Sequence, residues 1–479
     1  MTGSSRVVAV VLAAGEGSRF GGGKLLASIE GRPVLQHVLD RLAEAGIGDV
    51  VVVLGEDADA IEAAIDWRAA RRVRNPDPRR GLSSSLQVGI DVLDDAVGAA
   101  LIVLGDQPRL SLVAIRALLD AGVDVGVDRP IAVPVYPADT GRNPVRLGRA
   151  AFALVAQATG DRGLGPLIDA HPELVREVPV PGATEGNPDI DTRADLVQAV
   201  ESAWAARVRA NADQVDRFRE LPDGTDFYAP VTGLFRADPA RVDEPALDAL
   251  LALVRPGETW LDIGAGAGRY ALPIARALAA SGGAVIALDS SAAMLAALRE
   301  IADEHAIANV RDVNGRWPSP ADQLASYAAD VALIAHVGYD IEAIGPFIAA
   351  MESSARRLCV AVLMERQPSS IADVCWPSVW GEDRITLPAL PEFVGWLRAR
   401  GRALAIQRLE REPRRFDSRH ELEGFLRRQL WTMPGSAADK RFRHALEPLI
   451  ETDPDGRVGL VGQRALPIGI VTWAPGERP

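Results

Sequence analysis

Both halves of this 479-residue chain alternate short apolar runs, rich in β-branched residues, with stretches whose apolar residues recur at helical spacing. The predicted strands are residues 7–12, 50–54 and 100–104 in the first half, and 259–263, 284–288, 331–334 and 358–363 in the second. Strand and helix in this rhythm predict parallel sheets with helices on both faces. The predicted fold class is therefore α/β, with two Rossmann-like three-layer domains in tandem whose ligands lie beyond the carboxyl ends of the strands.

The length and one break in the helical pattern predict two domains. A chain of this size exceeds what a single hydrophobic core usually serves, and 48% hydrophobic residues are enough for a packed core throughout. A helical pattern runs toward Phe218, and the Pro-Asp-Gly sequence at 222–224 breaks it. We therefore predict domains at 1–204 and 226–479, joined by a helical linker at 205–225.

The net charge and the cysteine content indicate which binding partners and which cellular compartment to expect. A net charge of -13 argues against binding to nucleic acid or to an anionic membrane, so small-molecule substrates are expected. The two cysteines, Cys359 and Cys375, form no Cys-x-x-Cys pair, which predicts a reducing cytoplasm and neither structural zinc nor a disulfide. The apolar run at 7–15 leads into charged residues rather than a signal-peptide cleavage site. The protein is predicted to be cytoplasmic and soluble.

A glycine-rich loop, LAAGEGSRFGGGK at residues 12–24, follows the first predicted strand. Its glycines free the backbone to turn amides toward an anion, and Arg19 and Lys24 add positive charge, so the loop is predicted to bind phosphate. It is not a Walker A loop, because Ser18 stands where a glycine is required and Leu25 where a hydroxyl is required. A flexible surface loop is the alternative.

Acidic residues occur where a predicted strand ends and where a helix begins. Asp106, in Gly-Asp-Gln-Pro, follows the strand at 100–104, where its carboxylate is placed to hold the magnesium that accompanies triphosphates. Asp189 and Asp191 precede a helix that Thr192 is predicted to cap. A purely structural role is the alternative for any one of these acids.

A set of motifs in the first domain resembles those of MobA-like nucleotidyltransferases, and most of all molybdenum-cofactor cytidylyltransferases. In chain order they are LAAGEGSRFGGGK, GLSSSL, GDQP, RNPV, GDRGLGPLI and DIDT. The resemblance implies catalytic roles for Lys24, Arg19 and Asp106. It further implies a nucleotide site of Leu12, Ala13, Ala14, Gly15, Arg19, Lys24, Ser83 and Ser84, an acceptor contact at Asn143, and Mg²⁺ ligands at Asp106 and Asp191.

The same resemblance implies a reaction. A phosphate of the acceptor would attack the α-phosphorus of the nucleotide and release pyrophosphate, which needs positioning and charge neutralisation more than a protein nucleophile. The LAAG sequence at 12–15 favours CTP over GTP. The acceptor would be a molybdopterin-type cofactor, which a molybdoenzyme would then receive. The alternative is a sugar-phosphate nucleotidyltransferase, whose glycine-rich loop is similar.

A second glycine-rich turn, in the stretch LDIGAGAGRYALPIA, follows a strand and opens a helix in the second half. Asp262 ends the strand, and the glycines at 264–268 let a ligand approach the backbone at the amino end of the helix. A dinucleotide fold would place its third glycine where Arg269 stands. Asp289 ends the next strand, where its carboxylate can accept two hydrogen bonds from a ribose diol.

This turn and its acidic strand end resemble those of class I S-adenosylmethionine-dependent methyltransferases. The resemblance implies a site for S-adenosylmethionine formed by Asp262, Gly264, Gly266, Gly268, Asp289, Ser290, Met294 and Asn314. His336 follows the strand at 331–334, where it could act as a base toward an unknown methyl acceptor. A satisfied histidine at the sheet edge is the alternative for His336. A module that binds S-adenosylmethionine only to regulate the first domain is the alternative for the whole second half.

Overall fold

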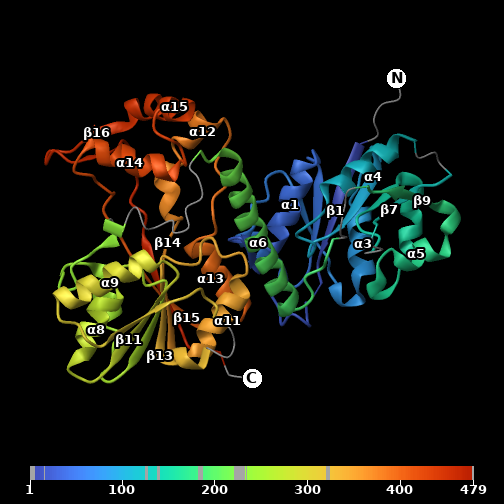
Figure 1. Ribbon diagram of the computed structural model, residues 1–479. Coiled ribbons are helices and arrows are strands. Elements are labelled where there is room, and N and C mark those ends of the chain that lie inside the picture. The colour runs from blue at the N-terminus through green and yellow to red at the C-terminus, as the bar shows by residue number, and fades with distance from the viewer. Residues whose placement is uncertain are drawn as a thin grey trace. The chain divides into compact units, whose positions relative to one another are not determined.

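The computed structural model describes residues 6–476 except 16, 125–127, 138–140, 182–186, 221–231, 234 and 320–323. The chain forms two compact units, unit 1 (Met1–Ala199) and unit 2 (Val200–Pro479). Each unit contains a seven-stranded sheet with helices, so the tandem α/β fold is confirmed (Figure 1). The predicted linker at 205–225 is helical as far as Phe218, within α6 (Arg193–Phe218), and its last five residues lie outside the described part of the chain.

The sheet of unit 1 has the order β5-β4-β1-β6-β8-β7-β9. Its strands are β1 (Arg6–Ala13), β4 (Val50–Leu54), β5 (Arg71–Arg74), β6 (Val97–Leu104), β7 (Ile131–Val135), β8 (Val145–Gly148) and β9 (Val175–Pro179). The strands predicted from the sequence are confirmed and pair in parallel, with Ala9 opposite Val50 and Val10 opposite Ile102. β8 is antiparallel to β6 and β7, which the expectation of a parallel sheet missed. The described residues between β7 and β8 contain no helix, and the antiparallel pairing of the two strands shows that the chain reverses its direction there.

Alternate residues of β1 contact helices on opposite faces of the sheet, which makes unit 1 a three-layer domain. The helices are α1 (Val34–Glu44), α2 (Ala58–Ala64), α3 (Leu82–Asp91), α4 (Leu112–Asp124) and α5 (Gly165–Ala170). Val8 and Val10 join the core cluster that contains Leu86 of α3, whereas Val11 joins the cluster that contains Leu35 of α1. A short hairpin, β2 (Ser28–Ile29) and β3 (Arg32–Pro33), precedes α1.

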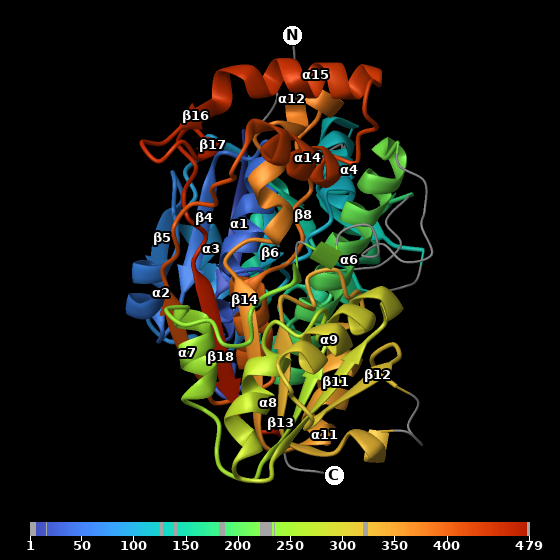
Figure 2. The same ribbon diagram turned by 60° about the vertical axis from the view of Figure 1, so that its left-hand side comes forward.

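The sheet of unit 2 has the order β12-β11-β10-β13-β14-β18-β15. Its strands are β10 (Thr259–Ile263), β11 (Ala284–Asp289), β12 (Val310–Asn314), β13 (Ala329–Ala335), β14 (Ala355–Met364), β15 (Leu404–Leu409) and β18 (Ile468–Trp473). The first five strands in this order are parallel. β18 pairs antiparallel with both β14 and β15, and it lies beside β14 in Figure 2.

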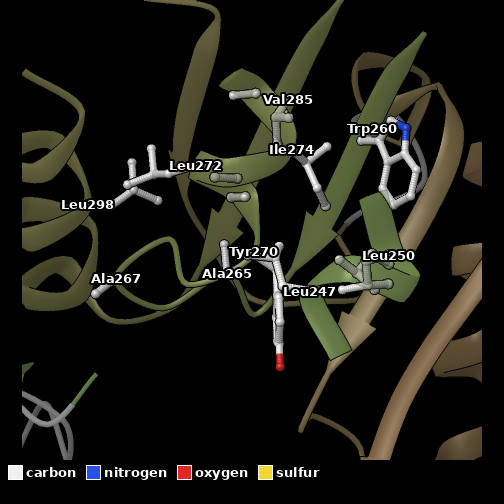
Figure 3. Close-up of a cluster of buried hydrophobic side chains, with 14 of the residues drawn as sticks. Leu247, Leu250, Trp260, Ala265, Ala267, Tyr270, Leu272, Ile274, Val285 and Leu298 are labelled. Atoms are coloured by element: carbon white, nitrogen blue, oxygen red, sulfur yellow. The ribbon is translucent and has the colours of Figure 1, made fainter. Parts of the chain in front are cut away.

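The main core of unit 2 lies between this sheet and its helices (Figure 3). The helices are α7 (Pro245–Leu251), α8 (Ala271–Ala279), α9 (Ala292–Glu304), α11 (Ile344–Ser354) and α13 (Leu390–Ala399). Figure 3 shows Trp260 of β10 near Leu250 of α7, and Leu272 of α8 near Leu298 of α9. The Tyr270 hydroxyl points away from this cluster.

A helical subdomain of unit 2 lies outside the sheet. It comprises α12 (Trp376–Trp380), α14 (Arg419–Gln429), α15 (Ala437–Leu446) and the hairpin of β16 (Ile450–Thr452) and β17 (Val458–Leu460). Trp376, Leu426 and Phe442 lie in its separate core. The carboxyl ends of β14 and β15 both lead into the helical subdomain, which places it on the side of the sheet where ligands are expected (Figure 1). No helix in the described part of the chain has the length and apolar character needed to cross a membrane.

A substitution of Ile274, whose side chain on α8 is 1% exposed, tests this packing. Ile274→Ala should lower the free energy of unfolding of unit 2 by about 2–5 kcal/mol, because it removes buried methyl groups and leaves a cavity. Val242→Ala is the control and should change this free energy by less than about 0.5 kcal/mol, since that side chain is 77% exposed. Tryptophan fluorescence in urea is the measurement, because Trp67 alone of the nine tryptophans precedes residue 200. Equal effects of the two substitutions would contradict the packing.

Candidate active sites

Lys24 lies between two carboxylates that are far from it in sequence. Its Nζ is 2.6 Å from Oδ2 of Asp106, which follows β6, and 3.3 Å from Oδ1 of Asp191, which precedes α6. Arg19 Nη1 is 3.4 Å from the other Asp191 oxygen. Burial by itself would lower the pKa of Lys24, but Asp106 and Asp191 outweigh it and raise the pKa, so the ammonium stays charged. The predicted catalytic and metal residues of unit 1 therefore meet at one point.

The two carboxylate oxygens of Asp106 have different surroundings. Its Oδ2 pairs with Lys24, whereas its Oδ1 is buried and has no hydrogen-bond partner among the described residues. Within the residues described, no group of three or more His, Cys, Asp or Glu side chains forms a ready-made metal centre. The carboxylates of Asp106 and Asp191 are oxygen groups of the kind that hard cations bind.

Thr192 and Asp195 cap the helix, so the Asp191 carboxylate faces Lys24 and Arg19 instead. The Asp195 carboxylate accepts hydrogen bonds from the backbone N–H groups of Asp191 and Thr192, at 3.1 and 2.7 Å. The Thr192 hydroxyl accepts in turn from the Asp195 backbone N–H. The predicted cap by Thr192 is confirmed, and it forms a reciprocal capping box.

Asp189 and Asn143 belong to one hydrogen-bond network. Gln107 Nε2 donates to Asp189 Oδ1 at 2.6 Å and to the Asn187 carbonyl at 3.0 Å. Asn187 Nδ2 donates to the Asn143 carbonyl at 3.0 Å, and the Tyr136 hydroxyl donates to the same carbonyl at 2.7 Å. Burial raises the pKa of Asp189, although the bond from Gln107 opposes this. The predicted acceptor contact Asn143 is thus tied to the segment that carries Asp191.

A cleft of about 400 Å³ opens beside Lys24. The predicted residues Ala13, Ala14 and Gly15 line it where β1 ends. The wall also includes Gly17 and Leu25 and five residues that were not predicted from the sequence, namely Gly55, Glu56, Asp57, Ile61 and Arg79. The signal was present, since the residues at 55–57 follow the carboxyl end of β4 just as the glycine-rich loop follows β1.

The remaining predicted nucleotide contacts lie outside this cleft wall. Leu12 is buried in β1, and its carbonyl accepts from the Gly105 backbone N–H at 2.9 Å. Ser83 and Ser84 are buried in α3, where the Ser84 hydroxyl accepts from Asn75 Nδ2 at 2.8 Å. The hydrogen bonds of these groups hold the backbone around the cleft.

The second glycine-rich turn, in unit 2, depends on left-handed backbone. Gly264, Gly266 and Gly268 have φ of 78°, 55° and 83°, a region that residues with a Cβ rarely adopt. A Cβ at Gly268 would also lie 2.7 Å from the Leu272 side chain. The N–H of Gly264 donates to the Leu288 carbonyl at 2.8 Å, which joins the turn to the end of β11. The turn therefore brings the ends of β10 and β11 together.

Two carboxylates meet at this turn in different environments. Asp262 is 3% exposed, and its Oδ1 is buried without a hydrogen-bond partner. Burial, with a further contribution from Asp289, raises the pKa of Asp262 to about 7. The Asp289 oxygens accept 2.8 Å hydrogen bonds from the backbone N–H groups of Gly266 and Ser291. A carboxylate oxygen can accept more than one hydrogen bond.

These groups line a cavity of about 580 Å³ in unit 2. Most of the predicted residues line it, namely Asp262, Gly264, Gly266, Asp289, Ser290, Met294 and His336. Met294, at 2% exposed, also belongs to the core. Gly268 belongs to the turn but not to the cavity wall, and Asn314 Nδ2 instead donates to the carbonyls of Asp289 and Ser290, at 3.1 and 3.2 Å.

Further residues of the cavity were missed from the sequence. Arg269 follows the glycine turn directly, and its Nη2 lies 2.9 Å from Oε1 of Glu244. Trp317 lies just beyond the end of β12, and its Nε1 donates to the Phe347 carbonyl at 3.1 Å. Both positions follow the carboxyl end of a strand, the same signal that located Asp262 and Asp289.

His336 lies at the carboxyl end of β13 with φ of 58°, and its backbone N–H donates to the Val362 carbonyl at 2.8 Å. Its Nδ1 is buried and has no hydrogen-bond partner. Burial first, and then the charges of Arg411 and Arg269, lower the pKa of His336 to about 4. The imidazole is therefore neutral at pH 7 and can exchange a hydrogen bond or a proton with a ligand in the cavity.

Part of unit 1 is similar to a known family of nucleotidyltransferase domains. Residues 9–175 match the family model of the MobA-like NTP transferase domain, so the expected resemblance to MobA-like nucleotidyltransferases is confirmed for this segment. The glycine-rich loop and Asp106 lie within the matched segment, whereas Asp191 follows it.

Individual proteins are similar to parts of this chain. The bifunctional protein GlmU of Brevibacillus brevis is 32% identical over 139 residues, which are 29% of this chain and 30% of GlmU. The chain thus spans about a third of the length of that curated relative. Rv0371c of Mycobacterium tuberculosis H37Rv is 28% identical, with 42% of this chain and 100% of that chain covered and a TM-score of 0.37. A precorrin-6y C5,15-methyltransferase of Geobacter metallireducens is 13% identical, with 50% and 93% covered and a TM-score of 0.29.

The raised pKa of Asp262 predicts a pH-dependent stability. The folded protein holds a proton on Asp262 up to about pH 7, whereas the unfolded chain releases it near its ordinary pKa of 3.8. The stability that this proton contributes is present below pH 3.8 and is lost as the pH rises through about 7. Asp262→Asn should therefore stabilise unit 2 relative to wild type more at about pH 8 than at about pH 5.

Urea unfolding at the two pH values measures this difference. His336 has the opposite pH dependence of stability, because its lowered pKa costs stability as the pH falls below the ordinary pKa of histidine. Both proteins contain His336, so comparison with wild type cancels this contribution. Asp303→Asn, at an exposed position of α9, is the control and should show no such trend. A pH-independent difference for Asp262→Asn would mean that Asp262 is ionised in the folded protein across this range.

Proposed function

We propose that unit 1 transfers a cytidylyl group from CTP to a molybdopterin-type cofactor and releases pyrophosphate. The observation that carries this proposal is the convergence of Lys24, Asp106 and Asp191 beside the cleft that begins at the glycine-rich loop. Lys24 would neutralise the triphosphate, and the backbone at Ala14 and Gly15 would approach it closely. The acceptor's phosphate oxygen would attack the α-phosphorus in line, and pyrophosphate would leave with the electron pair of the broken bond.

We propose Mg²⁺ as the metal of this reaction. The unpartnered Oδ1 of Asp106 and the nearby Asp191 carboxylate fit a hard cation that takes oxygen ligands. When bound, Mg²⁺ supplies charge neutralisation for the phosphates. Lys24 occupies the space between the two acids, so it must move toward the triphosphate for both carboxylates to bind metal.

A sugar phosphate is the second candidate acceptor for unit 1. The similarity to GlmU proteins favours this alternative. GTP is the second candidate nucleotide. Calorimetric titration with CTP, GTP and ATP in Mg²⁺ separates the nucleotides, and turnover with a sugar 1-phosphate or with molybdopterin cofactor then separates the acceptors.

Asp106→Asn should lower kcat for nucleotidyl transfer by at least about 100-fold, because it removes the negative charge that the metal and Lys24 require. Binding of S-adenosylmethionine should be unchanged. Asp95→Asn, at a fully exposed acid of unit 1, is the matched control. Pyrophosphate release is the measurement, and near-normal release by Asp106→Asn would exclude this site as the reaction centre.

We further propose that unit 2 binds S-adenosylmethionine and transfers its methyl group. Asp262 supplies an unpartnered buried oxygen in the cavity wall, and a Cβ at Gly266 would meet nothing within 4 Å, so the turn leaves room for a ligand. The antiparallel β18 also favours this proposal over a dinucleotide fold, whose strand order lacks such a member.

The residues of the cavity would have separate roles. Asp289 would bind the ribose hydroxyls, and the aromatic rings of Trp317 and Phe347 would contact the adenine. The cofactor supplies an activated methyl group when bound. The acceptor's lone pair would form the new bond as the carbon–sulfur bond breaks, and its proton would pass to neutral His336 or to water. A regulatory module without turnover is the alternative, favoured if S-adenosylmethionine binds and alters nucleotidyl transfer instead.

Asp289→Ala should weaken S-adenosylmethionine binding by at least about 10-fold, since it removes charge-assisted hydrogen bonds, and should leave nucleotidyl transfer intact. Asp303→Ala on α9 is the control acid. Calorimetric titration with S-adenosylmethionine measures the affinity. Loss of both activities in a still-folded Asp289→Ala protein would contradict two independent sites.

A further inference from the structure

Gln107 connects the two segments that carry the acids of the unit 1 site. It follows Asp106 directly, and it is 3% exposed. Its Nε2 donates to Asp189 Oδ1 at 2.6 Å and to the Asn187 carbonyl at 3.0 Å. A carbonyl oxygen can only accept a hydrogen bond, so the side-chain nitrogen of Gln107 must face it. One buried side chain therefore joins the turn after β6 to the segment before α6.

The backbone of Asp106 takes part in the same connection. The Ile190 backbone N–H donates to the Asp106 carbonyl at 3.0 Å, and Asp191 is the next residue. This bond and the two bonds from Gln107 hold the backbone of Asp191 beside that of Asp106. The two acids are far apart in the sequence, so tertiary hydrogen bonds rather than local chain geometry set the distance between their carboxylates.

Asn187 anchors the other end of this segment. Its Oδ1 accepts from the Ser111 backbone N–H at 2.8 Å. Its Nδ2 donates to the Tyr136 hydroxyl and to the Asn143 carbonyl, each at 3.0 Å. These anchors do not involve Gln107. A substitution at position 107 should therefore change the spacing of the acids without detaching the whole segment.

We propose that Gln107 is a positioning residue that sets the spacing of the Asp106 and Asp191 carboxylates and, through it, the affinity of unit 1 for a divalent cation. Hard cations bind oxygen ligands at short, defined distances, so displacement of one carboxylate weakens binding. Hydrogen bonds from outside the ligand set hold such ligands in place. That the cation serves nucleotidyl transfer rests on the proposed function, whereas the spacing rests on the hydrogen bonds of Gln107.

Titration of the full chain with Mn²⁺, followed by the electron paramagnetic resonance of the free ion, tests this role. All proteins carry Lys24→Met, which removes the ammonium between the two carboxylates. The binding that Asp106→Asn abolishes defines the site. Gln107→Glu should weaken this binding by at least about 10-fold, because it replaces the donor with a carboxylate that repels Asp189.

Exchange of the donor and the acceptor should restore the binding. In Gln107→Glu/Asp189→Asn, the side-chain amide at position 189 can donate to the carboxylate at position 107, so the pair keeps a hydrogen bond and its net charge. The Mn²⁺ affinity should return to within about 3-fold of that of the Lys24→Met parent. Asp189→Asn alone keeps an acceptor for Gln107 and should change the affinity by less than about 3-fold.

Gln87→Glu is the matched control for a loss of stability. Gln87 Nε2 donates to the carbonyls of Val155 and Ala158, at 3.3 and 3.1 Å, and these carbonyls are not part of the site. The substitution removes comparable hydrogen bonds from unit 1. It should lower the free energy of unfolding of unit 1 and leave the Mn²⁺ affinity unchanged.

Each outcome decides the proposal. Selective weakening in Gln107→Glu that the exchange reverses supports it. An equal loss in Gln87→Glu, no recovery in the exchanged pair, or no Asp106-dependent binding of Mn²⁺ in the parent overturns it. A loss in Asp189→Asn as large as that in Asp106→Asn also overturns it, because Asp189 would then be a metal ligand itself. Pyrophosphate release by the wild-type chain tests the proposed function separately, and its absence would leave the positioning role standing.

Discussion

Both candidate sites depend on one constraint, which is that parallel strands all end at the same edge of their sheet. In unit 1, β1 and β6 pair in parallel, so the loop with Lys24 and the turn with Asp106 emerge side by side. In unit 2, β10 and β11 do the same for Asp262 and Asp289. The backbone hydrogen bonds of the sheets thus bring together side chains that are distant in sequence.

Burial then determines what these side chains can do. Lys24 remains charged although it is largely buried, because two carboxylates contact it. Asp262 has no cationic partner among the described residues, and burial, with a further contribution from Asp289, raises its pKa to about 7. His336 is half-buried, with its Nδ1 atom fully buried, and its lowered pKa keeps it neutral at pH 7. A buried ionisable group without an opposite charge beside it has a shifted pKa and can exchange a proton. A buried group with an opposite charge beside it stays ionised, and its charge can bind phosphate.

The sequence predicted the central strands and the chemistry at their ends because both signals are local. Runs such as Val50–Leu54 and Thr259–Ile263 became strands with unchanged bounds, since buried parallel strands are continuously apolar. The antiparallel β8 gave no comparable signal, because its four residues and the short return before it resemble a loop. The wall residues Glu56 and Asp57 were also missed, although their position after a strand could have identified them.

The sequence by itself determined two α/β units, the glycine turns and the acids and lysine that follow the strands. Apolar periodicity and glycine placement act over a few residues, so no distant partner is needed to read them. Only the tertiary structure decided that Lys24 meets Asp106 and Asp191, and that Asn187 holds the Asn143 carbonyl. Those contacts join segments tens to hundreds of residues apart, and sheet order and loop packing, which no short pattern encodes, determine them.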